Sequence, residues 1–284
     1  MQIKLKDVSF IYSPKTPFET LALSNITLSI GENEFIGLIG HTGSGKSTFI
    51  QLLNGLLFPT KGKLYIDGKE IREYRSLVDI RRKIGVVFQY PEDQFFEENV
   101  FNEIAFGLKN MGLPDLVIEK RVKKVLELVD LDPKVFCKRS PFHLSGGEKR
   151  RLAIAVVLAM KPDLIIFDEP GVGLDPKSKE KIFALIHGLY KEGTSIILVS
   201  HDMDVVASFS NRILVMNKGK IILDDTPYVV FIKNRKLLES INLDIPDMSK
   251  ILFDLKKCGY DVDPGLFNIS EIKKEIERIL NGLI

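Results

Sequence analysis

The sequence predicts an α/β protein, and three features support this fold class. Short runs that are apolar at every position alternate with longer helical patterns, as in parallel sheets buried between helices. A glycine-rich segment directly follows the first of these runs. Of the 284 residues, 45% are hydrophobic and 27% are charged, which is the balance of a folded globular protein. A chain of this length is expected to form one main domain with an appendage.

Two kinds of strand are predicted. Residues 3–12, 22–30 and 62–67 alternate in polarity, and the last segment ends in an Asp-Gly turn signal, so together they predict an antiparallel β subdomain. Runs that are apolar on both faces predict buried parallel strands. These runs are residues 35–39, 164–167, 195–199 and 213–216.

Helical patterns lie between the buried runs, at residues 47–56, 118–129, 148–160 and 177–190. The segment from about residue 90 to 160 is rich in helical pattern, so we expect a helical subdomain inserted into the α/β core. After residue 227 the strand pattern stops, and a final helix is expected near residues 270–283. This tail of roughly 55 residues is too small for a core of its own and is expected to pack on the main domain or on a partner.

A phosphate-binding loop is predicted directly after residues 35–39. The segment matches the pattern G-x-x-x-x-G-K-[ST] between a strand and a helix, and its backbone N–H groups are expected to converge on the phosphates of a nucleotide. Lys46 is expected to neutralise the β- and γ-phosphate oxygens, and the hydroxyl of Ser47 to coordinate Mg²⁺. The candidate ATP-binding residues of the loop are Gly40, His41, Thr42, Gly43, Ser44, Gly45, Lys46, Ser47 and Thr48.

Two further buried runs end in residues suited to phosphate chemistry. Asp168 follows the run 164–167, expected beside the strand that feeds the loop, and is the candidate for holding Mg²⁺ through water. The adjacent Glu169 is the candidate for polarising the water that attacks the γ-phosphate. His201 follows the run 195–199 and would lie at the same sheet edge, where it can orient that water. A solvated acidic pair is the alternative for the two carboxylates, and the phosphate loop makes it the weaker one.

A second glycine motif narrows the class of nucleotide-binding protein. Residues 144–148 read Leu-Ser-Gly-Gly-Glu and resemble the signature sequence of ATP-binding cassette (ABC) ATPases. With Gln89, residues 173–175 and His201 in the expected order, the resemblance covers residues 1 to about 225. It implies a P-loop NTPase of ABC type, with a nucleotide-binding domain over residues 1–228 and a small, mostly helical C-terminal extension over residues 229–284.

The resemblance also implies roles for residues outside the phosphate loop. Tyr12 looks like the aromatic residue on which adenine stacks, with simple packing as the alternative. Gln89 matches the glutamine that senses Mg²⁺ and the attacking water, and Asp175 matches the aspartate that reaches across a dimer. The signature loop would bind the γ-phosphate of a partner subunit, so a head-to-tail dimer with a copy or a paralogue is implied. Its residues are Ser145, Gly146, Gly147 and Glu148.

The subfamily is indicated by longer stretches. Residues 89–96 and 150–155 resemble the ATPases of energy-coupling-factor importers and of cobalt and nickel uptake systems, and residues 16–19 with 40–43 are similar to the second of their two paired ATPases. This implies uptake of a vitamin or transition-metal ion through a transmembrane T-component and a substrate-binding S-component, at the cytoplasmic face of the membrane. Glu148 in place of Gln, and Gly171-Val172-Gly173 in place of Thr-Ala-Gly, depart from the family pattern. Hydrolysis is still expected.

Two other functions stay open, namely a soluble ABC ATPase that is not coupled to transport and a nucleotide-binding subunit with an idle hydrolytic site. A net charge of +2 gives no support to nucleic-acid binding. No run is long enough to span a bilayer, so a membrane role would be peripheral.

Two contact surfaces are predicted for such a subunit. The segment 89–101 is the predicted docking groove for a basic amphipathic helix, with an ordinary solvated turn as the alternative. Its aromatic residues Phe95 and Phe96 are expected to be exposed among Glu92, Asp93, Glu97 and Glu98. The tail is the predicted dimer contact, with a regulatory or packing role as the alternative.

Overall fold

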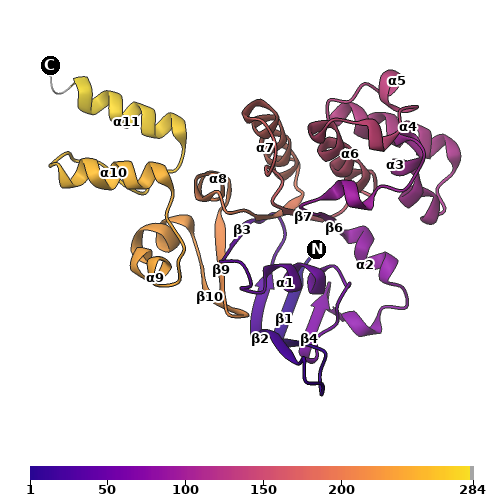
Figure 1. Cartoon of the computed structure of the whole chain (residues 1–284), viewed down its shortest axis with the longest axis horizontal. Helices are drawn as coiled ribbons and strands as arrows, with labels where there is room; N and C mark the ends of the chain where they lie inside the picture. The colour runs from indigo at the N-terminus through magenta and orange to yellow at the C-terminus, as the bar shows by residue number, and fades with distance from the viewer. Residues whose placement is uncertain (282–284) are drawn as a thin grey trace.

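Two β-sheets form the centre of the protein (Figure 1). The structure is a computed structural model that describes residues 1–281, with only the backbone described at residues 91, 92 and 281. The first sheet has the order β2-β1-β4-β5 and is antiparallel, which confirms the predicted β layer. Its strands are β1 (Ile3–Tyr12), β2 (Thr20–Ile30), β4 (Lys61–Ile66) and β5 (Lys69–Glu70). The predicted Asp-Gly turn joins β4 to β5.

The second sheet has the order β10-β9-β3-β8-β7-β6 and is parallel except at β10. All five residues of β3 and of β8 are buried, which explains why their sequences are apolar throughout. The strands are β3 (Phe35–Ile39), β6 (Ile84–Val87), β7 (Leu164–Asp168), β8 (Ser195–Val199), β9 (Arg212–Asn217) and β10 (Lys220–Asp225).

The sheet differs from the prediction in two respects. Strand β7 was expected beside β3, and this is wrong, because β8 pairs with both and lies between them. Strand β6 has no counterpart among the predicted strands, because its four residues directly continue helix α2 (Leu77–Lys83) without a turn signal between them. Both differences leave β7 and β8 with their carboxyl ends at the same edge as that of β3.

The helices cover the second sheet and extend to one side of it (Figure 1). Helix α1 (Lys46–Leu53) ends three residues earlier than predicted, because Gly55 adopts a left-handed conformation with φ 73° that terminates the helix. Helices α3 (Val100–Asn110), α4 (Asp115–Leu128), α5 (Pro133–Phe136) and α6 (Gly146–Ala159) lie together on one side. Helices α7 (Pro176–Lys191) and α8 (Met203–Phe209) follow β7 and β8.

The apolar run after Arg151 lies in α6 and is part of the protein core. Leu152, Ile154 and Ala155 are fully buried against residues of α3, α4 and the sheet. Within residues 1–281, no helix combines the length and apolar character needed to cross a membrane.

The C-terminal tail packs in two parts. Near its start, Val230, Phe231 and Leu238 are buried against Val206 and Val215 of the main domain. Farther along, helices α10 (Asp247–Lys257) and α11 (Ile269–Asn281) enclose a small core of their own around Leu252, Val262 and Ile272. The expectation that the tail has no core of its own is therefore wrong for its second half, where two amphipathic helices bury their apolar faces against each other. The last part of the predicted final helix, residues 282–283, lies outside the described residues.

Candidate active site

The phosphate loop is shaped by close contacts of its glycines. Strand β3 leads into Gly40, where an added Cβ would lie 2.4 Å from the carbonyl oxygen of Met216, so a side chain does not fit. Gly45 precedes α1 with φ 105°, a left-handed conformation that favours glycine. The Nζ atom of Lys46 donates hydrogen bonds to the carbonyl oxygens of Gly40, at 2.6 Å, and His41, at 3.1 Å. The ammonium group is thus held over the loop.

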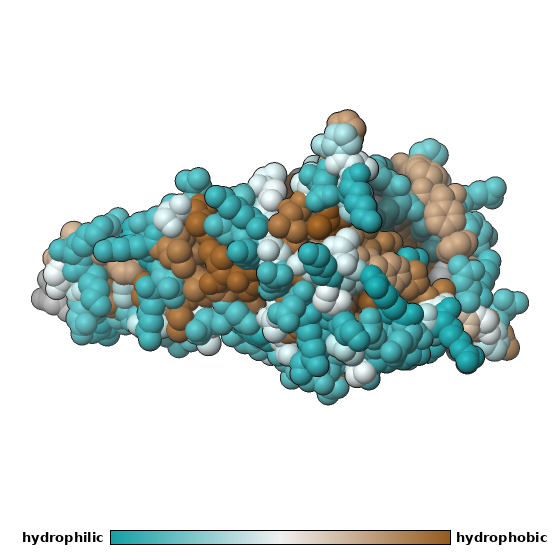
Figure 2. Space-filling model, turned by 90° about the horizontal axis from the view of Figure 1, so that it is seen from below, coloured by the Kyte–Doolittle hydropathy of each residue, from teal (hydrophilic) through white to brown (hydrophobic). Residues whose placement is uncertain are grey.

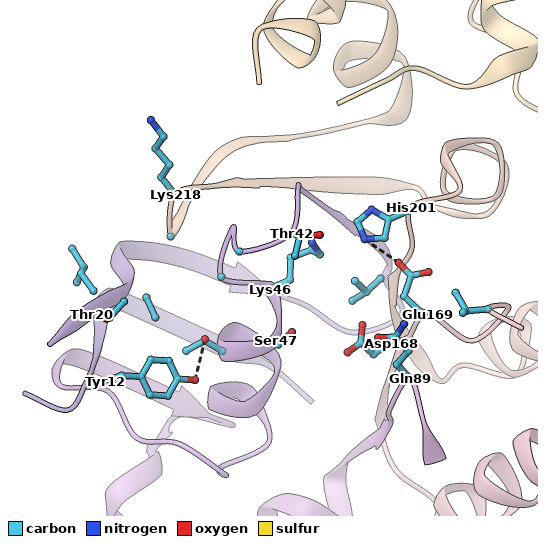
Figure 3. Close-up of a pocket in the computed structure, with 18 residues that line it drawn as sticks. Tyr12, Thr20, Thr42, Lys46, Ser47, Gln89, Asp168, Glu169, His201 and Lys218 are labelled. Carbon is cyan, nitrogen blue, oxygen red and sulfur yellow. Dashed lines mark hydrogen bonds and ion pairs between the residues drawn. The ribbon is translucent and has the colours of Figure 1, made fainter. Parts of the chain in front are cut away.

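This loop opens into a cavity of about 560 Å³, a size suited to a nucleotide-sized ligand (Figure 3). The cavity contains most of the predicted site residues of this subunit. These are Tyr12, Thr42, Gly43, Gly45, Lys46, Ser47, Thr48, Gln89, Asp168, Glu169 and His201. Gly40, His41 and Ser44 belong to the loop but do not line the cavity; they contact the end of β9 and the turn after it.

The Tyr12 side of the cavity is open to solvent. Tyr12 is 39% exposed, and its hydroxyl lies 3.1 Å from the Oγ1 atom of Thr48 on α1. Its ring contacts Phe10 edge to face at 4.8 Å between centroids. This arrangement fixes the ring beside the phosphate loop, where a base can stack on it.

The opposite side carries the two predicted groups for water activation. The backbone N–H of Glu169 donates to the carbonyl oxygen of Val199 at the end of β8, and Glu169 has φ 51°, an uncommon conformation for a residue with a side chain. The Nε2 atom of His201 lies 3.5 Å from the Oε1 atom of Glu169, too long for a good hydrogen bond. The hydroxyl of Ser200 is 3.4 Å from the other carboxylate oxygen. The structure therefore brings Glu169 and His201 together.

Burial controls the protonation of this pair. Desolvation, with the charge of Asp168 as a second cause, raises the pKa of Glu169 to about 7. Desolvation and the nearby ammonium of Lys46 lower the pKa of His201 below its usual value, which favours the neutral imidazole over the protonated one. A carboxylate with a pKa near the working pH is suited to accepting a proton.

Three oxygen donors converge beside the phosphate loop. The hydroxyl of Ser47, the amide of Gln89 and the carboxylate of Asp168 line both the main cavity and a connected cavity of about 340 Å³. Burial raises the pKa of Asp168, and Lys46 opposes this shift. Mg²⁺ is typically held by one or two carboxylates together with phosphate oxygens, so these residues fit Mg²⁺ bound to a nucleotide.

The signature loop lies outside this cavity. Ser145 caps α6, and its N–H and hydroxyl donate to the carboxylate of Glu148 at 2.7 and 2.8 Å. Asp175 caps α7 by accepting a hydrogen bond from the N–H of Ser178 at 3.0 Å. Within one subunit, the signature residues and Asp175 therefore stabilise helix starts, and the structure does not bring them to the phosphate loop of their own chain.

The segment after Gln89 differs from the prediction at one aromatic residue. Phe95 was expected to be exposed, and this is wrong, because it is 8% exposed and packs in the core of the helical region. Phe96 is 59% exposed and contacts Phe106 edge to face at 4.8 Å. Glu98 and Asp93 are exposed, and Glu97 is half-buried. The predicted acidic surroundings also include Glu92, whose side chain lies outside the described part of the protein.

Several cavity residues were not predicted as site residues. They are Thr20, Leu21, Ala22, Val172, Val199, Lys218 and Gly219. Lys218 and Gly219 directly follow the buried strand β9. The position after a buried strand, which indicated Asp168 and His201, could therefore have indicated these two residues as well. The side chain of Lys218 points away from the other labelled residues (Figure 3). Thr20 and Leu21 lie in the cavity wall because β2 pairs with β1 in a register that places Thr20 opposite Tyr12.

Comparison with known proteins identifies the class. The sequence matches the family model described as ABC transporter over residues 23–172, more than half of the chain. The chain therefore belongs to the ABC transporter ATPase family, and the predicted fold class is confirmed.

Individual relatives are similar over nearly the full length. The chain is 49% identical to the energy-coupling factor transporter ATP-binding protein EcfA2 of Clostridium perfringens (strain 13 / Type A), over 284 residues and 99% of each sequence. It is 50% identical to the EcfA2 protein of Caldanaerobacter subterraneus subsp. tengcongensis, over 286 residues and 99% of each sequence. The resemblance to the energy-coupling-factor ATPases is thereby confirmed.

Solved structures agree with this assignment. CbiO1 from Clostridium perfringens, part of the ABC transporter complex CbiONQ, superposes with a TM-score of 0.73 at 35% identity, over 88% of this chain and 98% of that one. A dimeric ATP-binding cassette in a post-hydrolysis state, bound to ADP and phosphate, superposes with a TM-score of 0.71 at 32% identity, over 79% of this chain and 98% of that one.

Proposed function

We propose that this chain is the ATP-hydrolysing subunit of an energy-coupling-factor importer and drives uptake of a vitamin or transition-metal ion through a transmembrane partner. The observation that carries the proposal is the approach of Glu169 to His201 on the side of the cavity opposite Tyr12, with Lys46 nearby (Figure 3). An idle nucleotide-binding subunit would not need this pair. The near full-length similarity to EcfA2 proteins supports the transport system.

Each side of the cavity has its own task in hydrolysis. Adenine stacks on Tyr12, and the loop N–H groups and Lys46 bind the phosphates. Glu169 accepts a proton from the water that attacks the γ-phosphate, and neutral His201 orients the reacting groups. Ser47, Gln89 and Asp168 would hold Mg²⁺, which supplies charge neutralisation of the phosphate oxygens when bound.

A second ABC ATPase subunit completes the site. The N-terminus of α6 offers the N–H groups of Gly146 and Gly147 and the positive end of the helix dipole, but neither residue lines the cavity of its own chain. We infer a head-to-tail dimer, with a paralogue or a second copy, in which this loop binds the γ-phosphate held by the partner and Asp175 lies at the interface.

The docking surface is the exposed part of the segment after Gln89. Phe96 and Phe106 form an exposed aromatic pair beside Glu97 and Glu98, which suits a basic amphipathic helix of a transmembrane T-component. The buried carboxylate of Glu103 accepts hydrogen bonds from the N–H groups of Phe96 and Glu97 at 3.1 and 3.0 Å, so the surface is fixed. Gln89, Asp93 and Gln94 line the cavity that also contains Asp168. A displacement of the docking surface would therefore shift the residues that would hold Mg²⁺.

Removing this surface tests the transport proposal. The triple variant Phe96→Ala, Glu97→Lys, Glu98→Lys is expected to lose co-purification with membranes that contain the T- and S-components, while ATP binding is kept. The control is Phe142→Ala, another exposed aromatic residue, at 53%. Membrane association equal to that of the control would refute docking here. Co-purification of the unaltered protein with ribosomes instead of membranes would favour the soluble ABC ATPase.

We infer that the tail also contacts the second subunit. Helices α10 and α11 extend away from the sheets (Figure 1) and expose Ile251, Ile269 and Leu280, at 46%, 73% and 55%. A hydrophobic area also lies between the C-terminal end and the middle of the molecule (Figure 2). Exposed apolar residues on this helix pair, which also packs on the main domain through Phe253 and α8, suit a contact that persists when ATP leaves.

Truncation after Pro246 tests this tail contact. Deletion of residues 247–284 removes α10 and α11 but keeps Leu238, Leu243 and Ile245, which are buried in the core cluster shared with the main domain. Sedimentation without nucleotide is expected to show a shift from dimer to monomer with Mg-ATP binding unchanged. An unchanged dimer fraction would assign the tail a packing or regulatory role.

A further inference from the structure

One buried arginine joins three parts of the active site that are far apart in the sequence. Arg150 lies in α6, five residues after Ser145, and is 5% exposed. Its Nη1 atom donates to the carbonyl oxygen of Phe88 at 3.0 Å, and its Nη2 atom donates to the carbonyl oxygen of Val172 at 3.4 Å. Because a buried guanidinium is costly unless its N–H groups are satisfied, these contacts hold the side chain and both segments together.

The two carbonyl groups lie next to residues of the proposed chemistry. Phe88 immediately precedes Gln89, and Val172 lies three residues after Glu169. The turn between Glu169 and Val172 is closed by a hydrogen bond from the N–H of Val172 to the carbonyl oxygen of Glu169, at 3.3 Å. Val172 itself lines the nucleotide cavity. Arg150 does not itself line that cavity, but its two contacts hold the backbone next to residues that do.

The chemistry of the side chain matters more than its charge. Arginine presents several N–H donors in a planar fork and can bind two carbonyl groups in different directions, whereas lysine presents one small ammonium group. Lys149, the preceding residue of α6, is only half-buried and has no such contacts to these segments. A general need for positive charge on this helix does not explain the burial of Arg150.

We propose that Arg150 is a positioning residue that fixes Gln89 and the segment from Glu169 to Asp175 relative to helix α6, which Ser145 caps. Contact of Ser145 with the partner's nucleotide then sets the position of the water-activating groups of this subunit through one side chain. The proposal deepens the ATPase function proposed above and rests on it.

Three variants separate positioning from folding. In Arg150→Lys and Arg150→Met, kcat for ATP hydrolysis is expected to fall about 10- to 100-fold, because small displacements of reacting groups have large effects on rate. The Kd for Mg-ATP is expected to stay within about twofold, because Tyr12 and the phosphate loop are unchanged. Lys149→Met removes a positive charge from the same helix and should change neither quantity.

Hydrogen exchange is a second measurement, and it reports whether Arg150 holds the neighbouring backbone without depending on catalysis. The amides of Val172 and Leu174 donate within the turns that Arg150 holds, at 3.3 and 3.4 Å. Their hydrogen exchange in the nucleotide-free protein is expected to accelerate about 10-fold or more in Arg150→Lys, and not in Lys149→Met. Arg150→Lys alone decides the outcome if Arg150→Met does not fold.

The results distinguish failure of the positioning role of Arg150 from failure of the ATPase function on which it rests. Wild-type kcat and exchange in folded Arg150→Lys would overturn the positioning role, as would parallel loss of kcat and ATP affinity. If the unaltered protein hydrolysed no ATP in its complex, the ATPase function would fail, and faster exchange at residues 172 and 174 would still support the structural tie.

Discussion

Replacing Glu169 by Gln is expected to reduce ATP turnover about 100- to 10,000-fold, the usual contribution of a general base. The amide keeps the size of the side chain but cannot accept the proton of the attacking water. ATP affinity is expected to be retained, because Tyr12, Lys46 and the loop N–H groups are untouched. Phosphate release at saturating Mg-ATP and equilibrium nucleotide binding measure the two effects.

The control for this variant is Glu192→Gln, a change of the same kind at an exposed position. It should hydrolyse ATP at the wild-type rate. Undiminished turnover in Glu169→Gln would show that another group accepts the proton. Loss of ATP affinity together with turnover would place Glu169 in ground-state binding instead.

The same variant should be more stable at alkaline pH when nucleotide and Mg²⁺ are absent. The pKa of Glu169 rises from 4.5 to about 7 on folding, so the folded protein holds this proton more tightly than the unfolded chain. Stability is therefore lost as pH rises from about 4.5 to about 7 and stays reduced above that, by about 3 kcal/mol. Urea unfolding should show Glu169→Gln as the more stable protein at pH 8, with a much smaller difference at pH 5. A pH-independent difference would contradict the raised pKa.

The place of the proposed catalytic residues at one sheet edge was predictable because local sequence patterns determine it. A phosphate loop is recognised from its own residues, and parallel strands place the residues after them at one edge, which located Asp168, Glu169 and His201 without knowledge of strand order. The order itself was not predictable from these runs. Strand β8 separates β7 from β3, and this depends on which helices cross which face of the sheet.

Burial was predicted less well where it depends on distant segments. Phe95 and Phe96 are adjacent and chemically identical, yet the first packs in the helical core and the second is exposed. Arg150 lies within a run of three basic residues, yet it is buried and binds the carbonyl groups of two segments that lie 62 and 22 residues away. No pattern within α6 contains that information.

The variant Gly146→Asp is expected to keep its thermal stability and to lose ATP hydrolysis. An added Cβ at Gly146 meets no atom within 4 Å, and the residue opens α6, where an aspartate is favoured over glycine by the helix dipole. Gly146→Asp should therefore unfold at an equal or higher temperature than the wild type. Its carboxylate would face the γ-phosphate of the partner subunit, and two charges about 4 Å apart repel by about 4 kcal/mol at an intermediate dielectric constant. Hydrolysis by the dimer should fall about 1000-fold at the composite site.

The control is Gly188→Asp, in α7, where an added Cβ also meets no atom within 4 Å. It should retain full hydrolysis, which shows that the new charge acts by its place in the dimer. ATP binding to isolated Gly146→Asp subunits should match that of the wild type, because the cavity of the same chain does not include this loop. Weakened binding in the isolated subunit would mean that the loop serves its own nucleotide. A stable Gly146→Asp dimer with wild-type turnover would contradict the head-to-tail arrangement itself.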